Sequence, residues 1–143
     1  MKKPSVDLII KLHEMLIEKS GGSKGIRDLG LLESSINSPF QTYGGAELYP
    51  NDLDKIINIS YSLVKNHSFI DGNKRIGVLV LTVLLKENSY EVDWSDADLI
   101  KLGLELASGE MTKEDFNTFI ENKIIKDWDN LERGCLFYLN GIK

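Results

Sequence analysis

A run of apolar residues extends from Ile76 to Leu85, with charged residues on both sides. At helical spacing, apolar side chains surround most of the circumference of this run. A helix of this kind belongs in a protein core, and the run is shorter than the about 20 apolar residues that a membrane-spanning helix needs. The sequence therefore predicts a buried central helix that begins near Asn73 and is expected to end at Asn88.

Capping residues predict the other helices. Potential caps precede five apolar-faced stretches, of which the first ends at Gly21 and Gly22 and the second before Pro39. The caps are Ser5, Asp28, Asn51, Ser95 and Thr112, and the apolar positions include Leu8, Ile9, Leu12, Met15 and Leu16 in the first stretch and Phe116, Phe119, Ile120 and Ile124 in the last.

Residues 40–50 form two extended arms around a Gly-Gly pair, which predicts a β-hairpin. Residues 90–92 form a further short extended piece. We expect an all-α bundle of five to seven helices around a buried central helix, with one short hairpin.

Length and composition bound the class of protein. A chain of 143 residues fits one domain with one core. The single cysteine, Cys135, cannot form an internal disulfide, which suits the cytoplasm. The apolar cluster at residues 8–10 is interrupted at once by Lys11, so we expect neither a signal peptide nor a membrane anchor. A net charge of −5 argues against direct nucleic-acid binding.

The residues with the most chemical potential follow one another between two predicted helices, in the stretch HSFIDGNKR at residues 67–75. The N-terminus of a helix offers free N–H groups to anions, and Gly72 lets the backbone approach a ligand closely. Lys74 and Arg75 add cations suited to phosphate. A carboxylate at Asp71 would repel phosphate unless a cation such as Mg²⁺ lies between them. His67 is suited to take a proton from an incoming hydroxyl group near neutral pH.

Each of these residues also has an ordinary structural interpretation. A lone histidine at a helix end is more often held there by the helix dipole, and residues 71–73 taken alone are a common turn signal. Lys74 and Arg75 alone are ordinary surface charges of a first helical turn. Phe69, an aromatic residue between polar neighbours, is expected to anchor the loop in the core. The joint occurrence of these residues, in order, favours phosphoryl-type transfer over the ordinary interpretations.

The stretch at residues 67–75 resembles the signature of the Fic superfamily, HxFx(D/E)GN(G/K)R, and every constant position of that signature is met. Residues 25–34, 41–45 and 48–50 resemble blocks of its death-on-curing (Doc) branch. The resemblance covers about residues 5–92, with a looser likeness through a helix that ends near Ile124, and implies the all-helical fold of the family. It implies a family-like core at residues 5–125 and a C-terminal extension at 126–143. It also implies an enzyme that uses Mg-ATP to modify a protein hydroxyl group.

The resemblance assigns a role to each residue of the stretch. It implies that His67 is the general base, that Asp71 is the Mg²⁺ ligand, and that the phosphates are bound by Gly72, Asn73, Lys74 and Arg75. The hairpin resembles the family's flap, which pairs with the target protein as a strand would, and its expected target-binding residues are Thr42, Tyr43, Gly44 and Gly45.

Two departures from the commoner Fic pattern resemble the Doc branch. Lys74 replaces a glycine that is typical of adenylylating members, and Val78 replaces a second arginine. They favour a kinase, which transfers the γ-phosphoryl group, over an adenylyltransferase. In that branch the acceptor is a threonine of translation elongation factor Tu, so the resemblance implies a toxin that stops translation.

An inhibitory (S/T)xxxE(G/N) helix is expected to be absent, because Val83 stands where its nearest candidate, Glu87-Asn88, would need Ser or Thr. We therefore expect a separate antitoxin, of the Phd type. Two alternatives remain open: an adenylyltransferase of the same fold, and a catalytically idle Fic-like module that only binds partners. A nucleic-acid-binding repressor fits poorly, since the basic residues at 74–75 lead straight into an apolar helix.

Overall fold

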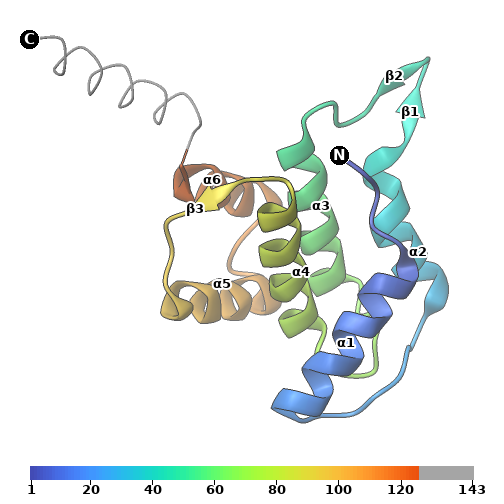
Figure 1. Cartoon of the computed structure of the whole chain (residues 1–143), viewed down its shortest axis with the longest axis vertical. Helices are drawn as coiled ribbons and strands as arrows, with labels where there is room; N and C mark the ends of the chain where they lie inside the picture. Colours follow the sequence, from blue (N-terminus) through green and yellow to red (C-terminus); the bar gives the residue numbers. More distant parts are fainter. Residues whose placement is uncertain (126–143) are drawn as a thin grey trace, which may run out of the picture.

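The computed structural model describes residues 1–125, so the predicted extension at 126–143 lies outside the described residues. Within this range the fold is mostly helical, which confirms the predicted class (Figure 1). The helices are α1 (Val6–Ser20), α2 (Leu29–Asn37), α3 (Asp52–Lys65), α4 (Asn73–Glu87), α5 (Asp96–Ser108) and α6 (Lys113–Lys123), with a 3₁₀ turn η1 (Ser38–Phe40). The strands are β1 (Thr42–Tyr43), β2 (Ala46–Glu47), β3 (Glu91–Val92) and β4 (Ile124–Ile125). None of the helices at residues 1–125 combines the length and the apolar content that crossing a bilayer requires.

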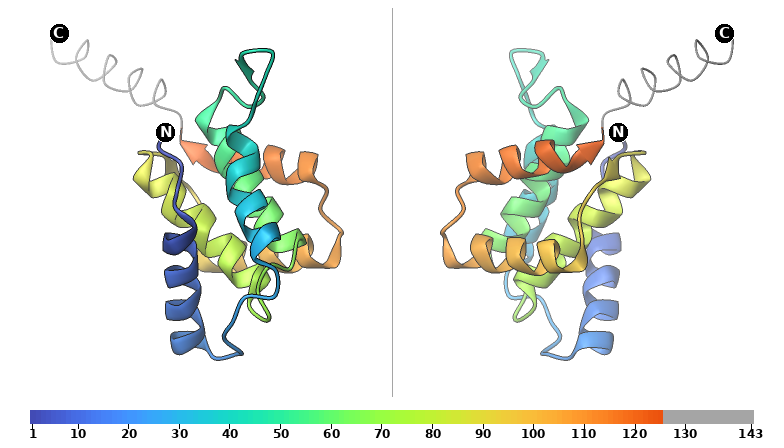
Figure 2. Two further views of the ribbon diagram at one scale, coloured as in Figure 1. Left: turned by 90° about the vertical axis from the view of Figure 1, so that its right-hand side faces the viewer. Right: turned by 90° about the vertical axis from the view of Figure 1, so that its left-hand side faces the viewer.

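The antiparallel pair α3 and α4 forms the middle of the fold, with α1, α2, α5 and α6 around it (Figures 1 and 2). The two helices approach closely at Gly77, whose carbonyl accepts a hydrogen bond of 2.8 Å from Ser60 Oγ. A Cβ atom at Gly77 would lie only 2.3 Å from Val64 Cγ2 and 3.0 Å from Ser60 O. The absence of a side chain at residue 77 is therefore what allows this crossing.

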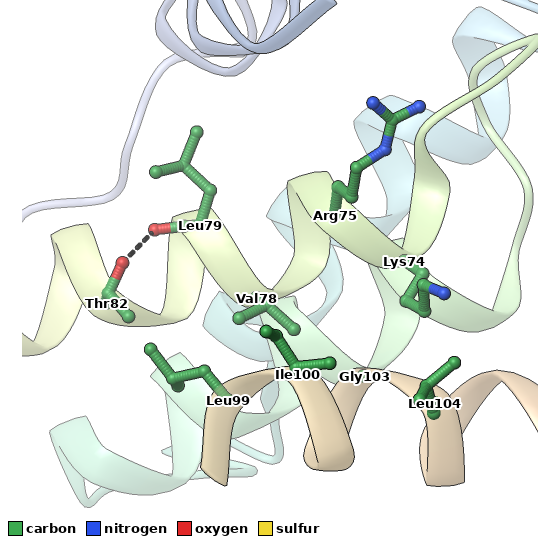
Figure 3. Close-up of a pocket in the computed structure, with 9 residues that line it drawn as sticks. All are labelled: Lys74, Arg75, Val78, Leu79, Thr82, Leu99, Ile100, Gly103 and Leu104. Carbon is green, nitrogen blue, oxygen red and sulfur yellow. Dashed lines mark hydrogen bonds between the residues drawn. The ribbon is translucent and has the colours of Figure 1, made fainter. Parts of the chain in front are cut away.

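The expectation that α4 is buried on all sides is wrong in part. Its fully buried positions are Ile76, Gly77, Val80, Leu81, Leu84 and Leu85. Val78 and Leu79 are only half-buried, and they line a pocket of about 450 Å³ between α4 and α5 (Figure 3). The reason is that α5 covers only part of this face of α4, so the apolar residues there are left beside an opening.

The predicted helix starts are confirmed by their capping hydrogen bonds. Ser5 Oγ accepts from Leu8 N at 3.0 Å, Asp28 Oδ1 accepts from Leu31 N at 3.0 Å, and Asn51 Oδ1 accepts from Leu53 N at 2.9 Å. The buried stripe of α1 differs from the expected one. It consists of Ile9, His13 and Ile17, whereas Met15 is 47% exposed.

The predicted hairpin is confirmed, but its strands are shorter than the two arms expected over residues 40–50. The hairpin has only two residues in each arm, with Thr42 opposite Glu47 and Tyr43 opposite Ala46. A second sheet was not predicted: β3 pairs with β4 in antiparallel fashion. Ile124, expected on the apolar face of the last helix, lies in β4 instead, because its backbone is extended and α6 ends at Lys123.

Asp98 closes a capping box at the start of α5 and predicts a pH effect. Its Oδ2 accepts from Ser95 N at 3.0 Å, and this bond, with Lys123 nearby, holds the pKa of Asp98 below its ordinary value of 3.8. A carboxyl group whose pKa is lowered by folding stabilises the fold above its unfolded pKa, and the gain is lost as the pH falls through the folded pKa. We expect Asp98→Asn to lower the free energy of unfolding at pH 7, and the difference from wild type to shrink below pH 3.8. Denaturant titrations at several pH values measure this, and a difference that grows on acidification would contradict it.

Candidate active site

The loop between α3 and α4 is closed by one side chain, that of Asn73. Asn73 Oδ1 accepts from Phe69 N at 2.9 Å, and Asn73 Nδ2 donates to Phe69 O at 2.9 Å. Phe69 is 1% exposed and forms a β-bridge with Ile26. The Asn73 side chain is thus used within the loop, and what this residue offers to a phosphate is its backbone N–H.

These two hydrogen bonds lead to a testable prediction about Asn73. We expect Asn73→Ala to lower the free energy of unfolding by about 1–3 kcal/mol, since two hydrogen bonds of about 0.5–1.5 kcal/mol each are lost. Thermal or denaturant unfolding measures the change. Asn73→Asp keeps the acceptor oxygen but replaces the N–H donor by a carboxylate oxygen, which the carbonyl of Phe69 repels. We therefore expect it to be no more stable than the alanine variant. A fully stable alanine variant would show that the loop does not depend on this side chain.

His67 lies at the end of α3 with its side chain exposed and its backbone in the left-handed region, at φ 50°. Such a conformation is uncommon outside glycine and often marks a functional site. Arg27 holds the backbone here, donating from Nε to His67 O at 2.6 Å and from Nη2 to Asn66 O at 3.1 Å. No group within residues 1–125 forms a hydrogen bond with the imidazole. The ring is therefore free to accept a proton.

Asp71 is held as a carboxylate by backbone N–H groups. Oδ2 accepts from Ser23 N at 3.0 Å and Oδ1 from Gly72 N at 2.7 Å. These bonds, with the Arg75 guanidinium 3.6 Å from Oδ1, lower the pKa of Asp71 from its ordinary value of 3.8. The residue is ionised at neutral pH, as a cation ligand must be.

The two cations of the motif point in different directions. Arg75 Nη1 donates to Ser20 Oγ at 2.7 Å and to Gly21 O at 2.8 Å, so its guanidinium is bound to the end of α1. Lys74 instead lies along α5, where a Cβ at Gly103 would be 3.1 Å from Lys74 Cγ (Figure 3). The Lys74 ammonium has no ion-pair partner among the residues that the structure describes.

A hollow of about 310 Å³ gathers most of the predicted site residues. Its lining residues are His67, Ile70, Asp71, Gly72, Asn73 and Lys74. Gly72 caps α4 at φ 76°, which a residue with a side chain rarely adopts. Arg75 does not line this hollow and lines the α4–α5 pocket instead. The structure thus combines a free imidazole, a carboxylate, helix N-terminal amides and one unpaired ammonium around a single space.

The hairpin lies at the opposite end of α3 from this hollow (Figures 1 and 2). The 14 residues of α3 separate the two, a length of about 21 Å at 1.5 Å per residue. Thr42, Tyr43, Gly44 and Gly45 are all exposed, and Tyr43 is 82% exposed. The structure does not bring these four residues to His67, so a target-binding role for them stays a prediction.

Sequence reasoning missed the residues that support the loop from elsewhere in the chain. They are His13, Ser20, Ser23 and Arg27. His13 had a signal: it is the one polar residue on the stripe with Ile9 and Ile17, spaced four residues apart. The serines act in part through backbone groups, for which a sequence carries no signal.

Comparison with known proteins places this loop in a described family. The model of the Fic/DOC family matches residues 3–85, which include α1, the hairpin and the whole loop. Among curated proteins, Toxin Doc of Mycolicibacterium smegmatis is 35% identical over 72 residues, covering 50% of this chain and 55% of that protein. The match thus spans about half the length of this curated relative.

Proposed function

Because the chain belongs to the Fic/DOC family, we propose that it is a Doc-type toxin enzyme that transfers the γ-phosphoryl group of Mg-ATP to a hydroxyl group of a target protein. Nucleotides are the general substrates of this family. The observation that carries the proposal is the hollow at the N-terminus of α4, where a free base and an anion-binding helix end meet. The 35% identity to a protein named Toxin Doc supports the toxin class.

Each group around the hollow has a place in the reaction. The His67 imidazole takes the proton of the acceptor hydroxyl as the oxygen forms its bond to the γ-phosphorus. The bond from that phosphorus to the β–γ bridging oxygen breaks, and ADP leaves. The N–H groups at the first turn of α4 and the Lys74 ammonium stabilise the charge of the phosphates.

Asp71 fits the role of a Mg²⁺ ligand. Its carboxylate is ionised, 45% exposed, and uses one lone pair of each oxygen for a backbone N–H, which leaves further lone pairs for a cation. No group of three or more metal-ligating side chains occurs within residues 1–125. One carboxylate together with substrate phosphates is a usual Mg²⁺ environment. The ion would neutralise phosphate charge there.

The surroundings of α4 favour γ-transfer over adenylylation. Lys74 packs its stem against Gly103 of α5 and lines both the hollow and the α4–α5 pocket, so this long side chain takes up space at the first turn of α4. One turn on, Val78 lines the α4–α5 pocket and supplies no phosphate ligand. Arg75 Nη1 donates to Ser20 and Gly21, so the guanidinium is held toward the end of α1 and only its remaining N–H groups are available to a phosphate. A site with few cationic side chains to bind the α- and β-phosphates suits an ATP whose γ-phosphate faces His67.

The target and the binding partner are part of the proposal. We propose a threonine of elongation factor Tu as the acceptor and a Phd-type antitoxin as the binding partner. The hairpin, at the far end of α3, is proposed to dock a part of the target that is remote from the acceptor. Strand pairing there would need about six extended residues to reach His67, at about 3.3 Å per residue.

The test is transfer of label from γ-labelled and, separately, from α-labelled ATP to purified elongation factor Tu and to a bacterial lysate. We expect label from the γ position only, on the factor, with Mg²⁺ required. Label from the α position would establish an adenylyltransferase instead. Stoichiometric Mg-ATP binding without transfer, with the target present, would indicate an idle binding module and refute the enzyme assignment.

A further inference from the structure

One buried histidine, His13 of α1, contacts the catalytic loop but is too enclosed to touch a substrate. Its side chain is 2% exposed. The imidazole stacks on the ring of Phe69, with centroids 3.8 Å apart and planes 9° apart. Its Nε2 lies 2.7 Å from the carbonyl oxygen of Asp71, which is 58 residues away in the sequence.

The chemistry of this contact sets the direction of the hydrogen bond. A carbonyl oxygen only accepts, so His13 Nε2 carries the proton and donates it. The donor is buried and the bond is partly buried, so a carbonyl that loses this donor loses a hydrogen bond on its protein-facing side. The contact is therefore more than space filling.

Holding the Asp71 carbonyl also orients the group that follows it. The peptide unit between Asp71 and Gly72 is planar, so the direction of the carbonyl sets the direction of the Gly72 N–H. That N–H donates to Asp71 Oδ1 at 2.7 Å, and Gly72 is the N-cap residue of α4. Through one bond, His13 constrains both the Asp71 carboxylate and the start of the helix whose amides face the hollow.

We propose that His13 is a positioning residue for the phosphate and Mg²⁺ site: by donating from Nε2 to the Asp71 carbonyl, it orients the Asp71–Gly72 peptide. The inference rests on the proposed function for its kinetic readout. Its structural part, the orientation of residues 69–72, stands independently of the reaction. The competing role is that of a core residue that only fills space against Phe69.

Two substitutions separate these roles, because they keep opposite halves of the contact. His13→Phe keeps the ring stacking on Phe69 and removes the donor. His13→Gln keeps an amide N–H donor on a side chain of similar reach and removes the aromatic ring. A space-filling role ranks Phe above Gln, whereas a positioning role ranks Gln above Phe. Ile9→Val, on the same buried stripe of α1, controls for a general loss of packing.

Two readouts are measured on each folded variant. For transfer from Mg-ATP, we expect His13→Phe to reduce kcat about 10- to 100-fold, the size of effect that a small misplacement of reacting groups produces. We expect the same variant to need a higher Mg²⁺ concentration for half-maximal activity. His13→Gln should restore most of the wild-type kcat and most of the wild-type Mg²⁺ dependence. For amide hydrogen exchange, we expect faster exchange at Ile70 and Gly72, which donate to Gly25 O and Asp71 Oδ1, in His13→Phe but not in Ile9→Val.

The exchange readout keeps this inference separate from the proposed function. If wild type transfers no label, the proposed function fails, and the exchange rates still decide the role of His13. Unchanged exchange at Ile70 and Gly72 in His13→Phe would overturn the inference. A wild-type kcat in His13→Phe together with a reduced kcat in His13→Gln would also overturn it. A fall in melting temperature alone, with unchanged kcat and Mg²⁺ dependence in the folded fraction, would also overturn it.

Discussion

Replacing His67 by alanine is expected to reduce phosphoryl transfer by about 10²- to 10⁴-fold, the usual contribution of a general base. The acceptor hydroxyl then loses the imidazole that takes its proton. Within residues 1–125, the other ionisable side chains that line the hollow are the Lys74 ammonium and the Asp71 carboxylate, which is held by its hydrogen bonds and by Arg75. Binding of Mg-ATP should be nearly unchanged, since the helix N-terminus and Lys74 remain. Initial transfer rates and calorimetric titration with a non-hydrolysable ATP analogue measure the two quantities.

A second variant excludes unfolding as the cause of this loss. His67→Gly removes the same imidazole and suits the left-handed backbone at φ 50°, which a side chain disfavours. We expect it to be as inactive as the alanine variant while its free energy of unfolding stays within about 1 kcal/mol of wild type. Substantial transfer by either variant would exclude His67 as the base.

Gly77→Ala is expected to destabilise the fold, because residue 77 lies where α3 and α4 approach closely. Its Cβ would lie 2.3 Å from Val64 Cγ2 and 3.0 Å from Ser60 O, and a backbone oxygen cannot rotate away. Overpacking a core typically costs about 1–3 kcal/mol, while alanine in place of glycine favours the helix by about 1 kcal/mol. We expect the overpacking cost to exceed the helix gain and to leave a net loss of up to about 2 kcal/mol, measured by chemical denaturation.

A double-mutant cycle tests the cause of this loss. Val64→Ala removes the Cγ2 atom that the new Cβ would meet, so Gly77→Ala should cost less in that background than in wild type. Gly30→Ala provides a matched control. Gly30 lies near the start of α2, where a Cβ would meet only Asp28 Oδ1 at 3.3 Å, and we expect a change below about 1 kcal/mol. Additive effects in the cycle would show that the loss does not arise from the contact with Val64.

Most residues of the candidate site could be identified from the sequence because they are contiguous. A loop of a few residues between two helices brings its members together wherever the rest of the chain goes. The hollow accordingly contains His67, Asp71, Gly72 and Lys74. The direction of Arg75 could not be predicted, since its partners Ser20 and Gly21 lie more than 50 residues away in the sequence.

The hairpin shows the opposite case. Its Gly-Gly turn was evident from the sequence, yet its distance from His67 depends on the straight course of α3 between them. Likewise, Tyr90–Val92 was expected to be extended, but its partner β4 lies about 30 residues later and was expected to be helical. A strand of two residues carries too short a pattern to specify its partner.

By itself the sequence determined where the helices begin and where most of them end, and it indicated nine contiguous residues as candidates for the chemistry. These features depend on hydrogen bonds over three or four residues, such as those of Ser5, Asp28 and Asn51. The tertiary structure alone decided what supports the chemistry: α1 delivers His13 to Asp71, and the turn after α1 delivers Ser23. Such pairings across the chain are selected by the packing of whole helices, in which many weak contacts act together, and no local pattern records them.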